Sequence, residues 1–255
     1  MSAPVRHGLL RHYDAKYRGE AAGAAPDGVA ASAFPRDRFE ACVRYVPRYF
    51  RGGDVLELAA GSGRVANALL SGGIDCGHYT LSEFSEARLE GLRHAVRDPR
   101  ARFAPLDAEA LPEAEAGRYD AVLMVALIEH LVDPLRAMQG VRRLLRPGGF
   151  VYVDTPNVAK WTRRLKLLLG RFPSTASGDE GLLTYDGAPV DLHDEGHLHY
   201  FTYRSLERML TGRCGFSRVE PLAYASSRLL GARLDHALAR MRPQLFSELC
   251  LVAFA

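Results

Sequence analysis

A short apolar segment that ends in a glycine-rich turn constrains the fold of this chain more than any other feature. The segment from Asp54 to Arg64 reads DVLELAAGSGR, and residues 64–70 continue it with helical periodicity. A strand that turns into a helix through Gly61 and Gly63 lets backbone N–H groups approach a nucleotide-like ligand, because glycine has no Cβ. An ordinary tight βα turn has the same local pattern, so the interpretation depends on later segments.

An acidic residue stands inside this first strand. Glu57 would repel a phosphate at the helix N-terminus but suits a ligand with a positive group. Residues 57–63 resemble motif I of the class I S-adenosylmethionine-dependent methyltransferases, (D/E)-x-G-x-G-x-G, with Ala59 at the first glycine position. The resemblance implies that S-adenosylmethionine binds at Glu57, Ala59, Gly61 and Gly63, with its α-ammonium near Glu57. Alanine would clash if position 59 requires a positive φ.

The next strand is also expected to end in an acidic residue. Residues 76–83 read as a strand ending at Glu83, and Ser85 is a plausible N-cap for the helix that follows. A carboxylate at this strand end can accept both hydrogens of a ribose diol, so Glu83 is assigned to the ribose. Two alternatives stay open: Thr80 takes this role, or Glu83 is an ordinary surface residue.

A third strand resembles the one whose end holds the adenine in this family. It begins near Arg102 and is followed by Asp107 and Ala108. The resemblance implies that the Asp107 carboxylate binds the exocyclic amine and that the backbone N–H of Ala108 reaches a ring nitrogen.

The fourth strand is predicted from an unbroken apolar run, Ala121 to Ile128, typical of a strand buried on both faces of a parallel sheet. Val125 in this run is included among the cofactor-binding residues. Glu129 and His130 follow the run, beside the expected sulfonium methyl, as candidates for orienting the acceptor or removing its proton. A structural role for His130 is equally open.

Two known family patterns are incomplete or missing at this strand end. In the ubiquinone-biosynthesis O-methyltransferases, an acidic residue three positions before the Glu-His pair is proposed to help hold a divalent metal. That position is Ala126 here, so no metal is predicted. The (N/D)-P-P-(Y/F) turn of enzymes that methylate nucleic-acid bases is absent, which argues against base N-methylation.

The remaining order of elements resembles the small-molecule branch of the class I family, similar to the ubiquinone-biosynthesis O-methyltransferases. A helix at 134–145, a turn at 146–149 and a strand at 150–154 are expected, with the motifs EHLxDP, LLRPGG and DTPN. The resemblance implies an α/β fold with a Rossmann-like, mostly parallel seven-stranded sheet and helices on both faces. A helix at 226–242 would precede a last, antiparallel strand at 248–255, inserted between the fifth and sixth strands.

Two regions outside this core look like additions. Residues 1–50 are expected to form an N-terminal lid or helical segment, with Tyr13, Tyr17 and Arg18 as lid candidates or parts of a plain surface helix. Residues 51–255 would form the methyltransferase domain, with a substrate insert at about 157–202. The insert begins with an amphipathic helix that packs on the domain or touches a membrane surface.

The insert also carries clustered histidines and acids between Asp191 and Thr202. Imidazole titrates close to neutral pH and suits removal of a hydroxyl proton during methyl transfer. His197 and His199 therefore join His130 as candidate bases, and Glu129 completes the catalytic set. A zinc site is not predicted, because no settled four-ligand spacing is present.

Composition agrees with one globular domain and leaves the acceptor open. The chain has 255 residues, 47% of them hydrophobic, and a net charge of +3, too small to argue for nucleic acid. Four scattered cysteines, with neither a signal peptide nor a membrane span, predict a reduced cytoplasmic protein. The expected reaction is O-methylation of a small hydroxylated acceptor, a sugar or a phenol. An RNA methyltransferase and a non-catalytic S-adenosylmethionine-binding protein remain alternatives.

Overall fold

The fold is described from a computed structural model, which covers residues 28–175, 197–226 and 230–255. The lid candidates Tyr13, Tyr17 and Arg18 and most of the predicted substrate insert lie outside these described residues. Within the residues that the structure describes, no helix is long and apolar enough to cross a membrane.

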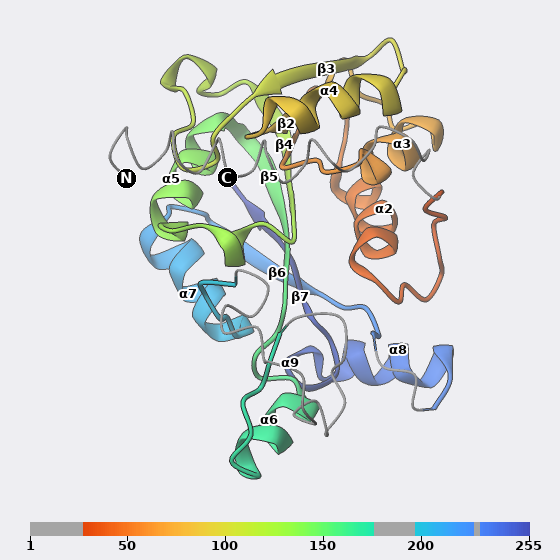
Figure 1. Cartoon of the computed structure of the whole chain (residues 1–255), viewed down its shortest axis with the longest axis vertical. Helices are drawn as coiled ribbons and strands as arrows, with labels where there is room; N and C mark the ends of the chain where they lie inside the picture. The colour runs from red at the N-terminus through yellow and green to blue at the C-terminus, as the bar shows by residue number, and fades with distance from the viewer. Residues whose placement is uncertain (1–27, 176–196, 227–229) are drawn as a thin grey trace.

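Seven strands form one sheet in the order β3-β2-β1-β4-β5-β7-β6 (Figure 1). The strands are β1 (Val55–Leu58), β2 (Tyr79–Glu83), β3 (Ala101–Pro105), β4 (Tyr119–Val125), β5 (Leu145–Thr155), β6 (Arg218–Leu222) and β7 (Leu249–Phe254). The first five pair in parallel, and β7 lies antiparallel between β5 and β6. The predicted Rossmann-like sheet with its inserted last strand is confirmed.

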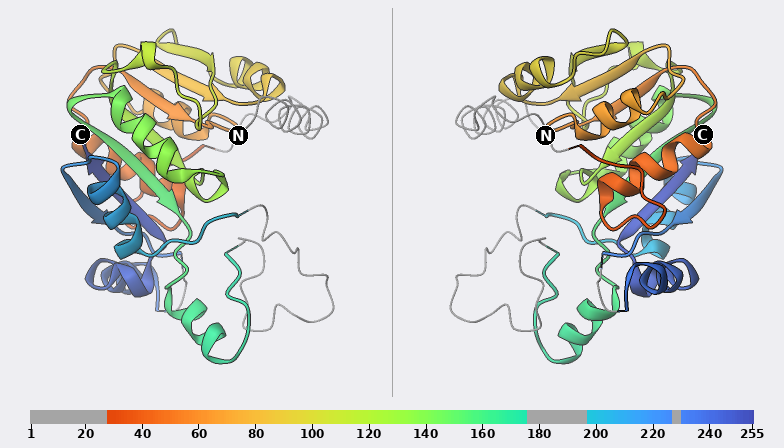
Figure 2. Two further views of the ribbon diagram at one scale, coloured as in Figure 1. Left: turned by 90° about the vertical axis from the view of Figure 1, so that its left-hand side faces the viewer. Right: turned by 90° about the vertical axis from the view of Figure 1, so that its right-hand side faces the viewer.

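Helices cover both faces of this sheet. They are α2 (Arg38–Tyr49), α3 (Arg64–Ser71), α4 (Glu86–Ala95), α5 (Pro134–Leu144), α6 (Trp161–Leu168), α7 (Tyr203–Arg213), α8 (Ala232–Met241) and α9 (Pro243–Phe246), with short 3-10 turns η1 (Glu113–Glu115) and η2 (Ile128–His130). Side chains of α2, α3 and α4 build the core on one face, and those of α5 and α7 build it on the other. The two side views of Figure 2 show α5 and α7 in front of the sheet and, from the opposite side, α2.

Side-chain caps start several of these helices where the sequence places a small polar residue. The side chains of Asp37, Ser85 and Asp133 each accept a bond from a backbone N–H of the first turn. Thr202 and Ser205 form a reciprocal capping box at α7. The predicted N-cap at Ser85 is therefore confirmed, and α4 begins beside the end of β2.

The fourth strand ends earlier than its apolar run predicts. β4 stops at Val125 rather than Ile128, because the next residue, Ala126, adopts a left-handed backbone with φ 51°. The chain then forms η2, which turns the fully buried side chain of Ile128 into the core beside α5. Burial in the helix layer rather than in the sheet explains why the apolar run continues beyond the strand.

Two further boundaries differ from the sequence prediction. β5 begins at Leu145, not at residue 150, because Leu145 already pairs with Tyr119 across a register shift in β4. α8 begins at Ala232 instead of residue 226, after Gly231 with φ 92°. All four cysteines are buried and free.

Candidate active site

Every second residue of the glycine-rich turn after β1 has a left-handed backbone conformation. Ala59, Gly61 and Gly63 have φ values of 54°, 61° and 76°. Position 59 thus has the positive φ that makes alanine unfavourable, by about 1–2 kcal/mol relative to the right-handed conformation. Backbone strain of this kind persists where surrounding structure fixes it, often at a ligand site.

The two glycines of the turn serve different purposes. A Cβ on Gly61 would meet nothing nearer than a guanidinium nitrogen of Arg88 at 3.7 Å, so the backbone there faces open space. A Cβ on Gly63 would meet the Cγ2 atom of Val96 at 2.5 Å. Gly63 therefore permits α3 to pack closely against the α4 region, and the space for a cofactor lies at Gly61.

Glu83 lies beside this open backbone. Its Oε1 accepts the N–H of Gly61 at 2.7 Å, and its side chain is buried at the end of β2. Burial raises the pKa of this carboxyl, while Arg88 and the Gly61 bond lower it. Thr80 lies within β2, where it pairs with Leu56 of the neighbouring strand. Glu83 thus occupies the strand-end position expected for a ribose ligand. Its place beside the Gly61 backbone is compatible with the predicted binding of an adenosyl group.

Glu57 is a buried residue of β1. Its side chain is 3% exposed, and its Oε2 accepts the hydroxyl of Tyr79 at 2.7 Å. Burial raises the pKa of this carboxyl to about 8; the Tyr79 bond lowers it and the charge of Glu83 raises it. The position places Glu57 under the turn, and its role toward an ammonium group stays a prediction.

The other predicted cofactor residues line the same carboxyl edge of the sheet. Asp107 follows β3 and accepts the N–H of Glu109 at 2.8 Å through Oδ1, which forms a tight turn around the half-buried Ala108. Val125 ends β4 and pairs with Asp154 of β5. Ligands of open α/β sheets bind where the strand order reverses, here between β1 and β4.

Three of the predicted catalytic residues converge after β4. One ligand atom each from Glu129, His130 and His197 lies within 4.8 Å of the others, and the two imidazole rings meet edge to face with centroids 4.8 Å apart. Both carboxylate oxygens of Glu129 are buried, and no hydrogen-bond partner appears among the described residues. Burial raises the pKa of this carboxyl, while His130 lowers it.

Residues 198 and 199 of the predicted insert are hydrogen-bonded to the backbone of this cluster. The carbonyl oxygen of Glu129 accepts the N–H groups of Leu198 and His199, at 2.8 and 3.1 Å. The His199 ring lies 3.2 Å, through Nε2, from the carbonyl oxygen of Val132, which makes His199 the donor. Of the three candidate bases, His130 and His197 are therefore paired with each other, and His199 is held by a backbone group.

Three side chains of this cluster, Glu129, His130 and His197, carry atoms that could bind a metal ion. The position of the acidic family ligand is Ala126, and His197 approaches from the insert instead. A separation of up to 4.8 Å exceeds the roughly 3.4 Å expected between ligands about 2.1 Å from a tetrahedral metal. The absence of a metal remains the prediction.

Sequence reasoning missed three charged residues near this cluster. Asp154, the penultimate residue of β5, has a buried carboxyl whose pKa burial raises to about 7; Arg38, 3.9 Å away, lowers this pKa and Glu129 raises it. Glu248 stands just before β7 and binds Lys160 and Arg163. The acidic end of β5 in DTPN was a usable signal for Asp154, by the argument applied to Glu83.

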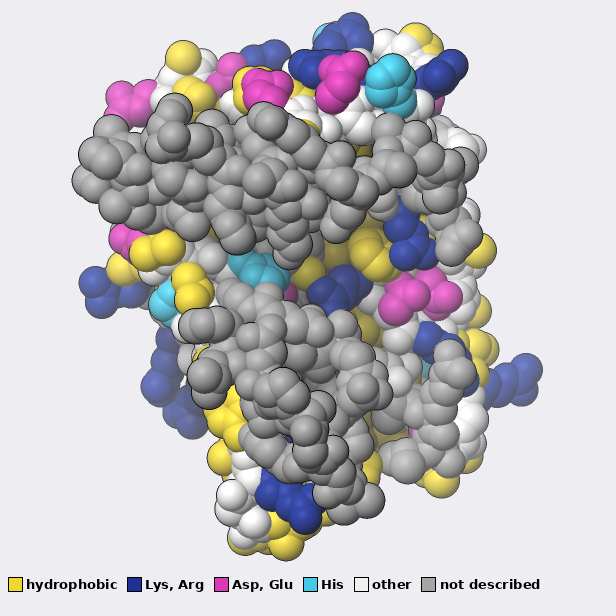
Figure 3. Space-filling model, viewed as in Figure 1, with side chains coloured by type: hydrophobic (Ala, Val, Ile, Leu, Met, Phe, Trp, Pro, Cys, Tyr) yellow, Lys and Arg dark blue, Asp and Glu magenta, His cyan; other side chains and the backbone are white. Residues whose placement is uncertain are grey.

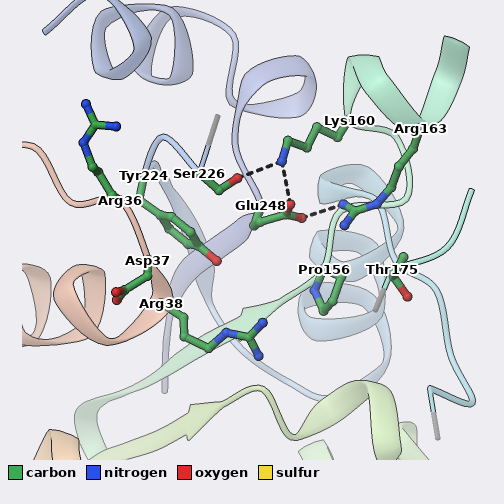
Figure 4. A pocket seen from close by; sticks show the side chains of 10 residues that line it. All are labelled: Arg36, Asp37, Arg38, Pro156, Lys160, Arg163, Thr175, Tyr224, Ser226 and Glu248. Carbon is green, nitrogen blue, oxygen red and sulfur yellow. Dashed lines mark hydrogen bonds and ion pairs between the residues drawn. The ribbon is translucent and has the colours of Figure 1, made fainter. Parts of the chain in front are cut away.

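A cavity of about 310 Å³ opens beside these residues. Its lining combines the start of α2, the chain after β5, the start of β7 and residues 175, 224 and 226 (Figure 4). In the space-filling view, histidine and basic side chains gather at the centre of this face (Figure 3). One lining residue, Arg38, lies 3.9 Å from Asp154, whereas no residue of the glycine-rich turn lines the cavity.

Solved structures share the fold at low sequence identity. The chain superposes with a TM-score of 0.60 on the Burkholderia thailandensis 1,6-didemethyltoxoflavin-N1-methyltransferase bound to 1,6-didemethyltoxoflavin and S-adenosylhomocysteine, at 16% identity over 100% of this chain and 91% of that one. The methyltransferase in complex with the Haloferax volcanii Trm112 activator gives 0.59, at 16% identity over 96% and 95% of the two chains.

Curated relatives match the central part of the chain. A ubiquinone biosynthesis O-methyltransferase of Bordetella avium is 32% identical over 109 residues, 42% of this chain and 44% of the relative. A demethylmenaquinone methyltransferase of Clavibacter sepedonicus is 34% identical over 111 residues, again 42% and 44%. The chain therefore spans less than half the length of these relatives.

A family model described as "Methyltransferase domain" matches residues 34–220, most of the chain. The match includes the glycine-rich turn, the strand ends and the cluster after β4. The chain therefore belongs to the methyltransferase domain family, whose class I members take their methyl group from S-adenosylmethionine.

Proposed function

We propose that this protein transfers a methyl group from S-adenosylmethionine to a hydroxyl group of a small acceptor. The cofactor, when bound, supplies an electrophilic methyl on a sulfonium. The turn at Gly61 would hold its methionine end, the Glu83 carboxylate its ribose hydroxyls, and Asp107 with the N–H of Ala108 its adenine. Glu57, which accepts the Tyr79 hydroxyl, would lie near its α-ammonium, and Gly63 permits the close packing of α3.

The convergence of Glu129, His130 and His197 after β4 carries the choice of acceptor. An imidazole there can take the proton that a hydroxyl loses as its oxygen forms the new bond to carbon. The buried Glu129 carboxyl group, close to both imidazoles, would stabilise the imidazolium that results. Positioning of the two reactants supplies most of the remaining acceleration.

The names of similar proteins include both oxygen and nitrogen acceptors. The Bordetella avium relative is named an O-methyltransferase, whereas the Burkholderia thailandensis structure is named an N1-methyltransferase. An amine acceptor is often already a nucleophile, but an aliphatic hydroxyl needs a base. The paired histidines therefore favour a hydroxyl, on a phenol or a sugar.

Turnover of labelled S-adenosylmethionine against phenols, sugars, amines and RNA tests this proposal directly. Label transfer to a phenol or sugar oxygen is expected, and transfer only to RNA or to nitrogen would refute it. Binding of S-adenosylhomocysteine without transfer to any acceptor would instead identify a non-catalytic binding protein.

Histidine variants locate the base once an acceptor is known. His130→Ala or His197→Ala should lower turnover by about 10²–10⁴-fold while leaving affinity for S-adenosylhomocysteine nearly unchanged. His199→Ala is the matched control, because its ring binds a backbone carbonyl and its loss should mainly lower thermal stability. Near-normal turnover in both His130→Ala and His197→Ala would show that positioning alone drives the reaction.

A further inference from the structure

Two buried cations share one carboxylate at the wall of the cavity. The Glu248 Oε1 atom accepts from Lys160 Nζ at 2.9 Å, and Oε2 accepts from an Arg163 guanidinium nitrogen at 2.7 Å. Lys160 is 4% exposed and Arg163 2%, so both positive charges are almost fully withdrawn from water. A buried cation is costly unless an anion compensates it, and among the described residues Glu248 is the carboxylate that binds both cations.

A third cation faces the same space from α2. Figure 4 shows the Arg38 guanidinium and the Tyr224 hydroxyl directed toward the cavity that Lys160, Arg163 and Glu248 border. Arg38 lies 3.9 Å from Asp154, whose pKa burial raises to about 7, so that carboxyl is only partly ionised near neutral pH. The described lining of the cavity therefore carries more basic than acidic side chains: Arg36, Arg38, Lys160 and Arg163 against Asp37 and Glu248.

We propose that this cavity binds an oxyanion carried by the methyl acceptor, either a carboxylate or a phosphate ester. Such a group would bring negative charge to a lining in which basic side chains outnumber carboxylates, and guanidinium and ammonium groups bind both kinds of oxyanion. The inference rests on the proposed function, since it names the class of acceptor for that same site: a hydroxylated acid rather than a neutral phenol or sugar.

The cavity connects to the candidate bases through one lining residue. The Thr175 hydroxyl lies 2.7 Å from Nδ1 of His197, and the His197 ring contacts His130. On the other side, Arg38 reaches Asp154, which pairs in register with Val125 at the end of β4. An acceptor anchored by its oxyanion in the cavity would thus direct the rest of its body toward the two histidines and the cofactor edge.

Matched small probes test the charge requirement. Benzoate, phenyl phosphate and the neutral benzamide are titrated into the full chain with S-adenosylhomocysteine at fixed ionic strength, with binding followed by ligand-observed NMR. At least tenfold tighter binding of benzoate or phenyl phosphate than of benzamide is expected, the effect of about one charge-assisted hydrogen bond. The preferred anion distinguishes a carboxylate from a phosphate acceptor.

Two arginine variants locate the site. Arg38→Gln should remove the preference for the anion, whereas Arg48→Gln, which deletes an exposed charge at the far end of α2, should keep it. Equal binding of all three probes, or equal loss in both variants, would overturn the proposal. Affinity for S-adenosylhomocysteine is measured in each sample, so failure to bind the cofactor would refute the proposed function separately.

Discussion

Replacing Glu248 by glutamine should destabilise the fold strongly, although the side chain keeps its size. Its carboxylate accepts three short bonds, from Lys160, Arg163 and the backbone N–H of Asn157. Burial acts to raise the pKa of this group, but Arg163 and Lys160 outweigh it and lower the pKa from 4.5 to about 2. Glutamine offers no charge to the two buried cations.

The magnitude follows from this pKa. A decrease from 4.5 to about 2 corresponds to about 3 kcal/mol of stability contributed by the ionised carboxylate. Breaking a buried ion pair from one side typically costs about 3–5 kcal/mol, which agrees. At about 2–4 °C per kcal/mol for a domain of this size, Glu248→Gln should lower the melting temperature by about 6–12 °C at pH 7.

Thermal unfolding by circular dichroism measures this loss, with Glu90→Gln as the control. Glu90 pairs with Arg93 and His94 on the exposed surface of α4, where an ion pair contributes at most about 1 kcal/mol. Because the folded pKa of Glu248 is depressed, its contribution is complete above pH 4.5 and disappears as the pH falls to about 2. A melting temperature of Glu248→Gln no lower than that of the control, or a difference unchanged down to pH 2.5, would refute the reasoning.

Three shorter predictions concern the cofactor edge. Glu83→Ala should weaken S-adenosylhomocysteine binding about 10- to 150-fold by calorimetry, and a larger effect of Thr80→Ala would show that the ribose assignment is wrong. Gly63→Ala should lower the melting temperature more than Gly61→Ala, because only its Cβ meets a buried valine side chain at 2.5 Å; equal losses would contradict this. Glu57→Gln should become more stable relative to the wild type as the pH rises from 4.5 to about 8. In this interval the wild-type protein loses stability, because the pKa of the Glu57 carboxyl is higher in the folded state than in the unfolded state. Parallel stability profiles of variant and wild type over this pH range would contradict the prediction.

The sheet and the cofactor edge could be predicted because their signals are local. The strand, the glycines and the acidic residue at residues 54–64 lie next to one another, and the same pattern of an apolar run ending in a carboxylate marks Glu83. Strand ends were less predictable: Ile128 is as apolar as Val125, but it is buried by a helix rather than by neighbouring strands. Hydrophobicity records burial, not the element that provides it.

The cavity lined by Lys160, Arg163 and Glu248 could not be predicted from the sequence, because its lining residues come from distant segments. Lys160 and Arg163 read as the basic face of an amphipathic helix, yet both are buried, while Leu168 of the same helix is 82% exposed. Their orientation depends on Glu248, which lies 88 positions beyond Lys160. Nothing in the periodicity of either segment indicates that pairing.

The position of β7 has a consequence for folding during synthesis on the ribosome. β5 and β6 do not pair with each other, because β7, which is made after both of them, lies between them in the sheet. Until residues 249–254 leave the exit tunnel, β5 has an unpaired edge, a hazard for association with other nascent chains. Glu248 is synthesised just before β7, so Lys160 and Arg163 cannot form their ion pairs with it until that stage. The cavity that Glu248 lines is thus complete only when the last strand joins the sheet.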